Sequence, residues 1–257
     1  MTKKKAFDIV KEARSSNKIS TKKFINTLFN DFIELHGDHL GGVDDDAIIG
    51  GIGFLNKIPV TVIGTQKGQN IQENIKRHFG SVQPAGFRKA QRLMIQAQKF
   101  GRPIITLINT PGAYPGEDAE YHGQASAIAS ILQTGMQLEV PILSIIFGEA
   151  GSGGALALAT GNQVWMTKNS FYSVLSPEGY ASIIWRDASK ADKAADKLEL
   201  TPNNLLEKGI IDKIIEEPDS TTSIEKIRNN IYQEVIKLQK LSRREIVKNR
   251  AERFKNF

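Results

Sequence analysis

The 257-residue sequence contains no cysteine. This absence excludes disulfide bonds, thiol nucleophiles and zinc or iron–sulfur sites built on cysteine. No apolar run reaches the roughly 18 residues expected of a membrane-spanning helix. The N-terminal lysines are not followed by the apolar segment that is typical of a secretory signal. Together these absences predict a cytoplasmic protein with no membrane partner.

What the chain does contain is typical of a globular protein. Hydrophobic residues make up 40% and charged residues 24% of the sequence, which suits a large core. The net charge of +6 and the pI near 9.3 indicate an anionic partner, such as nucleic acid, a nucleotide-bearing substrate or an acidic subunit. A generally basic surface explains the same numbers, so charge alone does not choose among these partners.

The most informative stretch is 139–161, where an apolar run leads into a glycine-rich segment. Residues 140–147 have the near-continuous apolar pattern of a strand that is buried on both faces. Four glycines follow within residues 148–154, and residues 155–159 are small and favour a buried helix. A strand–turn–helix of this kind leaves N–H groups unpaired at the helix start, so we expect them to bind an oxyanion. The alternative is a tight turn whose glycines only permit close packing.

Three known loop motifs fit this segment poorly. The P-loop requires a Lys directly after its second glycine, but here Gly153 is followed by Gly154. The dinucleotide fingerprint requires a third glycine beyond Gly151 and Gly153, and that glycine is missing. The nucleophile elbow fits around Ser152 except for its first glycine. Its His should follow the Ser along the chain, however, and all four histidines precede Ser152.

Periodicity of apolar residues predicts an α/β chain with a single central domain between two helical arms. The expected boundaries are 1–35 for the N-terminal arm, 36–218 for the domain and 219–257 for the C-terminal arm. Within the first arm we expect two helices, the second capped by Thr21. The other expected helices are 86–100, 117–137, 177–185, 190–197, 201–208 and 221–257, and the expected strands are 47–55, 58–65, 103–109, 163–168, 171–175 and 210–215.

A second glycine-rich loop spans residues 110–116. It contains two Pro-Gly pairs and follows the strand predicted at 103–109. Open α/β sheets keep their ligand sites at the carboxyl ends of strands, so this loop is expected beside a site. A third segment contains His36, His39 and three consecutive aspartates, which resembles a metal cluster only superficially. Its glycines are more typical of a loop, and we predict no metal site there.

Four stretches together resemble the alpha subunits of bacterial acetyl-CoA carboxylase carboxyltransferases. They are residues 77–94 (RHFGSVQPAGFRKAQRLM), 109–116 (NTPGAYPG), 148–156 (GEAGSGGAL) and 172–179 (YSVLSPEG). The resemblance runs in order from about residue 20 to the C-terminus without large gaps. It implies a crotonase-like fold, in which ββα units form a spiral and helix N-termini bind carbonyl oxygens.

The resemblance also implies the reaction and the partners. A carboxyl group passes from carboxybiotin, borne by a biotin carboxyl carrier protein, to acetyl-CoA, which gives malonyl-CoA for fatty acid biosynthesis. The implied assembly is α2β2, with most of the CoA side and a zinc ribbon on a homologous beta subunit. ATP is used by a separate biotin carboxylase component. Biotin is therefore the implied cofactor, and no metal is expected in this chain.

Carried onto this sequence, the family's oxyanion donors correspond to the main chain of Gly153 and Gly154. Losing one preorganised donor of this type typically lowers kcat by ~10²–10³. Family members often have glycine where this chain has Ala150, and a methyl group there should be tolerated if the φ of that residue is negative. No side chain is required as a general base, because the ureido anion takes the proton from acetyl-CoA.

Further residues are predicted to contact substrate or carrier. The substrate contacts are expected from Gly112, Ala113, Tyr114, Gly151, Ser176 and Glu178. A structural turn is the alternative for the loop residues, and helix N-capping is the alternative for Ser176 and Glu178. For Lys67, Arg77, Arg88 and Lys89 the candidates are CoA phosphates, carrier docking or simple solvation.

Two other classes of function remain as rivals. A crotonase-like acyl-CoA hydrolase or isomerase would use a carboxylate such as Glu149 or Glu178 as base and would act without a partner. A nucleic-acid-binding protein is suggested by the charge. The basic residues lack interleaved aromatics, however, and no nucleic-acid-binding signature is present, which argues against this rival.

Overall fold

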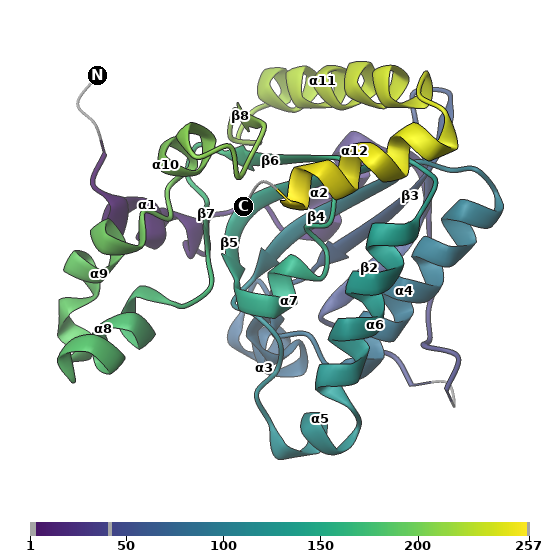
Figure 1. Ribbon diagram of the computed structural model, residues 1–257. Helices are drawn as coiled ribbons and strands as arrows, with labels where there is room; N and C mark the ends of the chain where they lie inside the picture. Colours follow the sequence, from purple (N-terminus) through teal and green to yellow (C-terminus); the bar gives the residue numbers. More distant parts are fainter. Residues whose placement is uncertain (1–3, 41–42, 256–257) are drawn as a thin grey trace.

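The computed structural model describes residues 4–40 and 43–255. At its centre lies an eight-stranded sheet in the order β1-β2-β3-β4-β5-β6-β8, with β7 paired to β5 beside this path. The first three strands are antiparallel, and the pairs from β3 onward are parallel. Figure 1 shows helices on both sides of this sheet.

The helices and strands alternate along most of the chain. The strands are β1 (Asn30–Glu34), β2 (Ile48–Leu55), β3 (Ile58–Thr65), β4 (Ile104–Thr110), β5 (Ile142–Gly151), β6 (Gln163–Thr167), β7 (Phe171–Ser173) and β8 (Lys213–Ile215). The helices are α1 (Ala6–Ala13), α2 (Thr21–Leu28), α3 (Ile71–Lys76), α4 (Pro84–Lys99), α5 (Glu117–Tyr121), α6 (Gln124–Gln137), α7 (Ser152–Leu156), α8 (Pro177–Trp185), α9 (Ala191–Leu198), α10 (Pro202–Glu207), α11 (Thr221–Gln239) and α12 (Arg243–Lys255), with short 3-10 turns η1 (His78–Gly80) and η2 (Ala188–Lys190).

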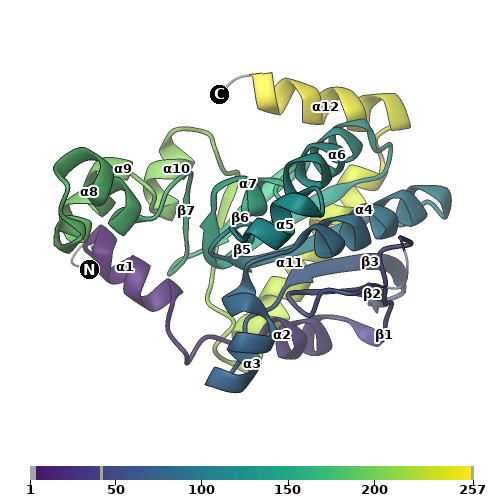
Figure 2. The same ribbon diagram turned by 90° about the horizontal axis from the view of Figure 1, so that it is seen from below.

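Both faces of the sheet are buried, which explains why its central strands are apolar almost throughout. In β5, Ile142 and Ile146 belong to the core beneath α4 and α6, whereas Leu143 and Phe147 belong to the core shared with α2 and α11. This alternation follows from the two-residue period of a strand. Figure 2 shows the resulting layers, with α4 and α6 on one face and α2 and α11 on the other.

A smaller apolar cluster holds α1 against α9, to one side of the sheet. It includes Val10 and Ala13 of α1, Ala195 of α9, and Phe171 of β7. In Figure 1 these elements lie with α8 and α10 at the left of the molecule. The chain that leaves this cluster after α1 must cross the carboxyl ends of β3, β4 and β5 before it enters α2. That crossing places residues 14–20 beside the sheet edge where a site was expected.

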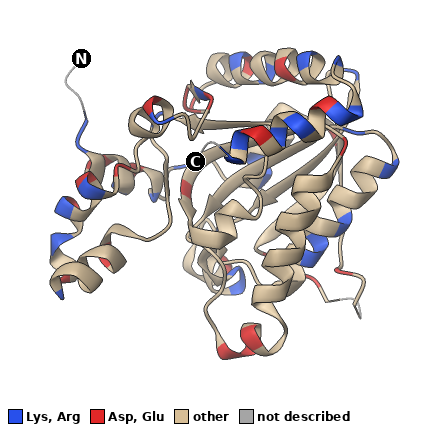
Figure 3. Ribbon diagram, in the orientation of Figure 1, with Lys and Arg blue, Asp and Glu red and all other residues tan. Residues whose placement is uncertain are grey.

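The C-terminal helix α12 is attached through a buried arginine. Arg250 has no exposed surface and donates to the carbonyl oxygens of Leu138 and Val140 and to Oδ1 of Asn162. Burial without a carboxylate lowers the pKa of Arg250 to about 10. Figure 3 shows Lys and Arg concentrated on α12, while the acidic residues of α5 lie at the lower edge of the view.

Several expected helices differ from the structure. The N-terminal segment is not helical throughout, because residues 30–34 form β1 and pair with β2. The cap of α2 is Ser20 rather than Thr21, since the Ser20 side chain accepts from the Lys23 N–H. The helix expected at 117–137 is two helices, separated where Gly123 adopts a φ of 82°. The long C-terminal helix is also two, because Ser242 and Glu245 form reciprocal side-chain bonds that begin α12.

Most of the other expected elements are confirmed, including the β2–β3 pair and the helix α4 that Gly101 follows with a φ of 65°. The division into a central domain with two arms at 1–35 and 219–257 stays a prediction. Within the described part of the chain, no helix combines the length and apolar character needed to cross a membrane.

Candidate active site

The two glycine-rich loops lie next to each other at the carboxyl ends of β4 and β5. The sequence predicted a turn from Gly148 onward, but β5 continues to Gly151. It does so because Glu149, Ala150 and Gly151 pair with the short strand β7. The turn is thereby reduced to the junction between Gly151 and the first residue of α7.

Close packing of main chain on main chain joins these loops. A Cβ atom at Gly151 would overlap the carbonyl group of Pro111, and one at Gly154 would overlap the main chain of Gly112 and Ala113. Only glycine permits such an approach at these positions. Close packing, which the sequence offered as the alternative to oxyanion binding, is therefore present at Gly151 and Gly154, and it brings the predicted biotin-side residues together.

The N–H groups of Gly153 and Gly154 lie in the first turn of α7. Neither donates a hydrogen bond to any acceptor in the described chain. First-turn amides have no partner within their own helix, so they remain available to an external oxygen. The donors expected from the sequence thus exist as free groups, and their role in oxyanion binding remains a prediction.

Ser152 connects β5 to α7 in a left-handed conformation, with a φ of 52°. A non-glycine residue in this region carries a conformational cost of about 1–3 kcal/mol, and such residues cluster at functional sites. The conformation resembles that of a nucleophile elbow. However, no histidine within the described residues bonds to Ser152. The strained residue therefore orients the first turn of α7 without forming a Ser–His pair.

Tyr114 is held from two sides. Its ring lies 4.8 Å from the ring of His78, measured between centroids, and its main chain pairs with Val82. His78 and Phe79 have left-handed φ angles of 48° and 56°, followed by Gly80 at 83°. Three left-handed residues in succession form a tight turn, which the sequence did not predict. This turn places the His78 ring against the loop that carries the predicted substrate contacts.

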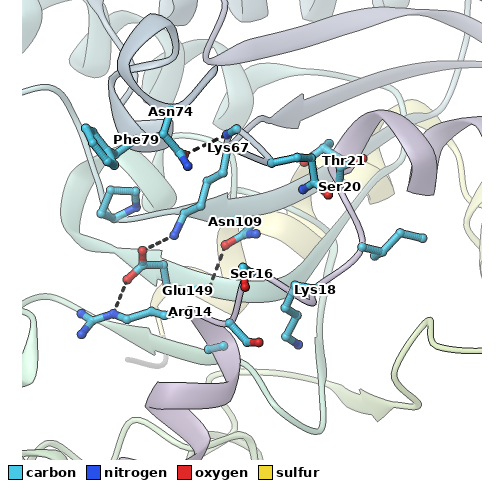
Figure 4. A pocket seen from close by; sticks show the side chains of 16 residues that line it. Arg14, Ser16, Lys18, Ser20, Thr21, Lys67, Asn74, Phe79, Asn109 and Glu149 are labelled. Atoms are coloured by element: carbon cyan, nitrogen blue, oxygen red, sulfur yellow. Dashed lines mark hydrogen bonds and ion pairs between the residues drawn. The ribbon is translucent and has the colours of Figure 1, made fainter. Parts of the chain in front are cut away.

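A cavity of about 430 Å³ lies beside the glycine loops, under residues 14–21. Its wall includes Arg14, Lys67, Asn109 and Glu149 (Figure 4). Pro111 borders it, but Gly153 and Gly154 do not. The free amides are therefore not part of the wall of this cavity.

Glu149 is the most heavily paired carboxylate of the site. It is 5% exposed and accepts hydrogen bonds from Lys67 and, at 2.8 Å, from Nε of Arg14. Arg14 also binds Glu178 through Nη1 at 2.8 Å. Burial alone would raise the pKa of Glu149, but the charges of Lys67 and Arg14 outweigh it and hold that pKa below its usual range.

This pairing has a chemical consequence for Glu149. A general base works best when its pKa lies near the working pH. A carboxylate whose pKa is lowered and whose two oxygens are both occupied by cations is a poor proton acceptor. The arrangement therefore fits a group that holds structure in place better than one that abstracts a proton.

The remaining predicted contacts all have partners inside the chain. Ser176 caps α8 by accepting from the Gly179 N–H, as the capping alternative expected, and Glu178 binds Arg14. The ion-pair partners of the predicted phosphate contacts are Glu149 for Lys67, Glu73 for Arg77, Asp38 for Arg88 and Asp44 for Lys89.

Lys89 differs from the other cations because it is only 1% exposed. It also donates to the carbonyl oxygen of Ile48 at 2.9 Å. Simple solvation is therefore wrong for Lys89, whose ammonium group braces the interior beside β2. Contacts of Lys67, Arg77 and Arg88 with phosphates or a carrier stay predictions.

The histidine–aspartate loop near residue 40 does not assemble a metal centre in the described part of the chain, where no group of three or more potential ligands converges. His36 instead lies 2.7 Å from a carboxylate oxygen of Asp44. Gly41 and Gly42, which contributed to the loop prediction, lie outside the described residues.

Arg14 is the residue that sequence reasoning missed. It lies 135 positions before Glu149, at the end of a helix expected to be only a peripheral arm. Its neighbours carry no motif, so nothing in the local sequence separates it from other surface arginines. Only the path of residues 14–20 across the sheet edge brings it to the site.

Comparison with known proteins gives a match along nearly the whole chain. The family described as acetyl co-enzyme A carboxylase carboxyltransferase-like matches residues 2–257. The chain is 51% identical over 251 residues to the acetyl-coenzyme A carboxylase carboxyl transferase subunit alpha of Streptococcus thermophilus, covering 97% of this chain and 98% of that protein. The Streptococcus gordonii protein of the same name is also 51% identical, with the same coverage.

Solved structures share the fold. Transcarboxylase 12S, crystallised with methylmalonyl-coenzyme A and methylmalonic acid, superposes with a TM-score of 0.71 at 20% identity, covering 89% of this chain and 44% of that chain. The beta subunit of geranyl-CoA carboxylase from P. aeruginosa gives 0.66 at 15% identity, covering 83% and 41%. This chain thus spans less than half of either structure, and the likeness confirms the predicted crotonase-like fold.

Proposed function

Because this chain belongs to the acetyl co-enzyme A carboxylase carboxyltransferase-like family, we propose that it supplies the biotin side of a transcarboxylation site. Its relatives at 51% identity are named carboxyl transferase alpha subunits, and the chain is accordingly a biotin-dependent carboxyltransferase subunit. The observation that carries the proposal for the site is the pair of free amides at Gly153 and Gly154.

In the proposed reaction the substrates are carboxybiotin, on its carrier protein, and acetyl-CoA. The C–N bond of carboxybiotin would break and release CO2, leaving its electron pair on the ureido nitrogen and oxygen. The ureido anion would then accept a proton from the methyl group of acetyl-CoA, and the resulting carbanion would bond to the CO2, which gives malonyl-CoA and biotin. Amides aimed at the ureido oxygen stabilise the charge as it forms, which lowers the barrier to transfer.

The residues fit this role in two respects. The first-turn amides of α7 are unoccupied by the chain's own acceptors, and Gly154 lies against the Gly112–Ala113 main chain. Tyr114, fixed by its contact with His78, supplies an aromatic wall in the same loop. We infer that Gly112, Ala113, Tyr114 and Gly151 border the bicyclic ring of biotin.

The partners belong to the same proposal. We place the acetyl-CoA half of the site on a beta subunit in an α2β2 assembly, and the zinc ribbon on that subunit. The biotin carboxyl carrier protein and an ATP-using biotin carboxylase complete a cytoplasmic system for fatty acid biosynthesis. To meet CoA phosphates or the carrier, Lys67, Arg77 and Arg88 would exchange their present carboxylate partners for the incoming anion.

The ion pairs of its candidate bases argue against the rival stand-alone acyl-CoA hydrolase. Glu149 is paired with two cations, and Glu178 is bound to Arg14.

The proposed function is tested by measuring transfer of a carboxyl group from malonyl-CoA to free biotin. We expect turnover when the chain is combined with its beta subunit and none with the chain alone. Hydrolysis of acyl-CoA by the isolated chain would contradict the proposal.

A further inference from the structure

The ladder between β4 and β5 is interrupted just before the glycine loop. Ile108 pairs with Ile146, but the next pair is Thr110 with Ala150, so β5 uses three residues where β4 uses one. Bulges of this kind redirect a strand and occur often next to active sites. The segment 147–149 therefore decides in which direction β5 runs into α7.

Side chains replace the missing ladder bonds at this bulge. The N–H of Glu149 donates to Oδ1 of Asn109 at 3.2 Å, and Nζ of Lys18 donates to the carbonyl oxygen of Phe147 at 2.8 Å. The carboxylate of Glu149 binds Lys67 and Arg14 (Figure 4). These cations come from different elements, since Lys67 follows β3 and Arg14 follows α1. The bulge is thus held from both sides by separate parts of the chain.

We propose that Glu149 is a positioning residue, whose carboxylate fixes the bulge and thereby the direction in which the amides of Gly153 and Gly154 are presented. Only Ala150 and Gly151 separate Glu149 from the strained Ser152 that begins α7. A shift of the bulge therefore passes directly to the donors. The inference depends on the function proposed above, because positioning matters only if those amides bind a reacting oxygen.

Stability alone does not account for this cluster of charges. Taking a carboxylate out of water is costly, and well-packed apolar residues often serve a buried site as well as an ion pair does. The pairing also reaches beyond the bulge, because Arg14 bridges Glu149 to Glu178 in the first turn of α8. A bridge of two carboxylates by one guanidinium fixes geometry in a way that an apolar contact does not.

The inference is tested on the chain assembled with its beta subunit, by reverse transfer from malonyl-CoA to free biotin. Rates are divided by the concentration of intact complex measured by native mass spectrometry. We expect Glu149→Gln, which keeps the shape and removes the charge, to lower kcat at least tenfold while KM for malonyl-CoA stays within twofold. Asp212→Asn is the control, since Asp212 is an ion-paired carboxylate that binds Arg253 of α12 and the Val164 N–H at the start of β6, and it does not contact the bulge. It should leave both constants within twofold.

The outcomes separate the two proposals. Absence of transfer by the wild-type complex would overturn the proposed function itself. Wild-type transfer together with a near-normal kcat for Glu149→Gln, or an equal loss in the Asp212→Asn control, would overturn the positioning role. If Glu149→Gln does not assemble, Lys67→Met removes one of the two cations and should still lower kcat several-fold. An unchanged kcat for that variant would count against the inference.

Discussion

Two buried charged residues, Glu149 and Arg250, stabilise the two ends of β5 in different ways. Glu149 lies at the carboxyl end of β5 and is paired with two cations. Arg250 serves the opposite end, where it binds the carbonyl oxygens of Leu138 and Val140. Glu149 is thus part of a network of charged side chains. Arg250 is a single cation that donates mainly to main-chain carbonyl oxygens.

The difference indicates different roles. Arg250 binds carbonyl oxygens just after α6 and attaches α12, so its replacement should lower the stability of the fold without changing the rate of carboxyl transfer. Glu149 lies three residues from the strained start of α7, so its replacement should change the rate of carboxyl transfer more than the stability. Variants at the two ends of β5 separate these roles.

The largest effect is expected where a side chain would separate the two glycine loops. Gly154→Val should lower transfer by ~10²–10³, because its Cβ overlaps the main chain of Gly112 and Ala113 and displaces a donor. The measurement is reverse carboxyl transfer per intact complex. Gly135→Ala is the matched control, since its Cβ would equally overlap Thr160 but far from the loops. A comparable loss of activity per complex in that control would refute the local explanation.

At the opposite end, Arg250→Met should reduce the free energy of unfolding by about 3 kcal/mol, because it removes the donor to the buried carbonyl oxygens of Leu138 and Val140. Urea unfolding of the chain measures the loss. Transfer by whatever complex remains assembled should stay near the wild-type value. A tenfold fall in kcat per complex would mean that α12 contributes to the site.

A smaller effect is expected for the coupling between Arg14 and Glu149. A double-mutant cycle on the free energy of unfolding, with Arg14→Gln and Glu149→Gln, should give a coupling energy of about 1–3 kcal/mol, because the carboxylate of the pair is buried. The exposed pair of Lys208 with Glu199 provides the reference and should give less than about 1 kcal/mol. Equal coupling in both pairs would contradict a special role for the bulge.

The smallest effect is a dependence of stability on pH. The pKa of Glu149 is lower in the folded chain than the value of about 4.3 expected when unfolded. Its ionisation therefore adds stability above that unfolded value, and this stability is lost as the pH falls through the folded pKa. The gap in unfolding free energy between wild type and Glu149→Gln should stay constant from pH 7 to about pH 5 and narrow as the pH falls further, through the folded pKa. A constant gap would show that the carboxylate charge is not what stabilises the bulge.

The sequence predicted the buried strands and both glycine loops because these depend on local patterns. The apolar run before Gly148 predicts a buried strand, and the two Pro-Gly pairs of residues 110–116 predict a loop. The free amides of Gly153 and Gly154 were also expected, since any strand–helix junction creates them.

What the sequence did not predict depends on contacts between distant segments. Phe32 continues the helical spacing of Phe24 and Leu28, but pairing with β2 makes residues 30–34 a strand. The extension of β5 to Gly151 requires β7, and the pairing of Glu149 requires Arg14 from the far N-terminus. Such long-range partners override local propensity and leave no mark in a short window of sequence.

The most direct test of the central claim is a crystal structure of this chain assembled with its beta subunit and biotin. We predict that the ureido oxygen lies about 2.7–3.1 Å from the amide nitrogens of Gly153 and Gly154. Biotin bound with that oxygen on other donors, and with both amides turned toward solvent or toward the chain itself, would contradict the account.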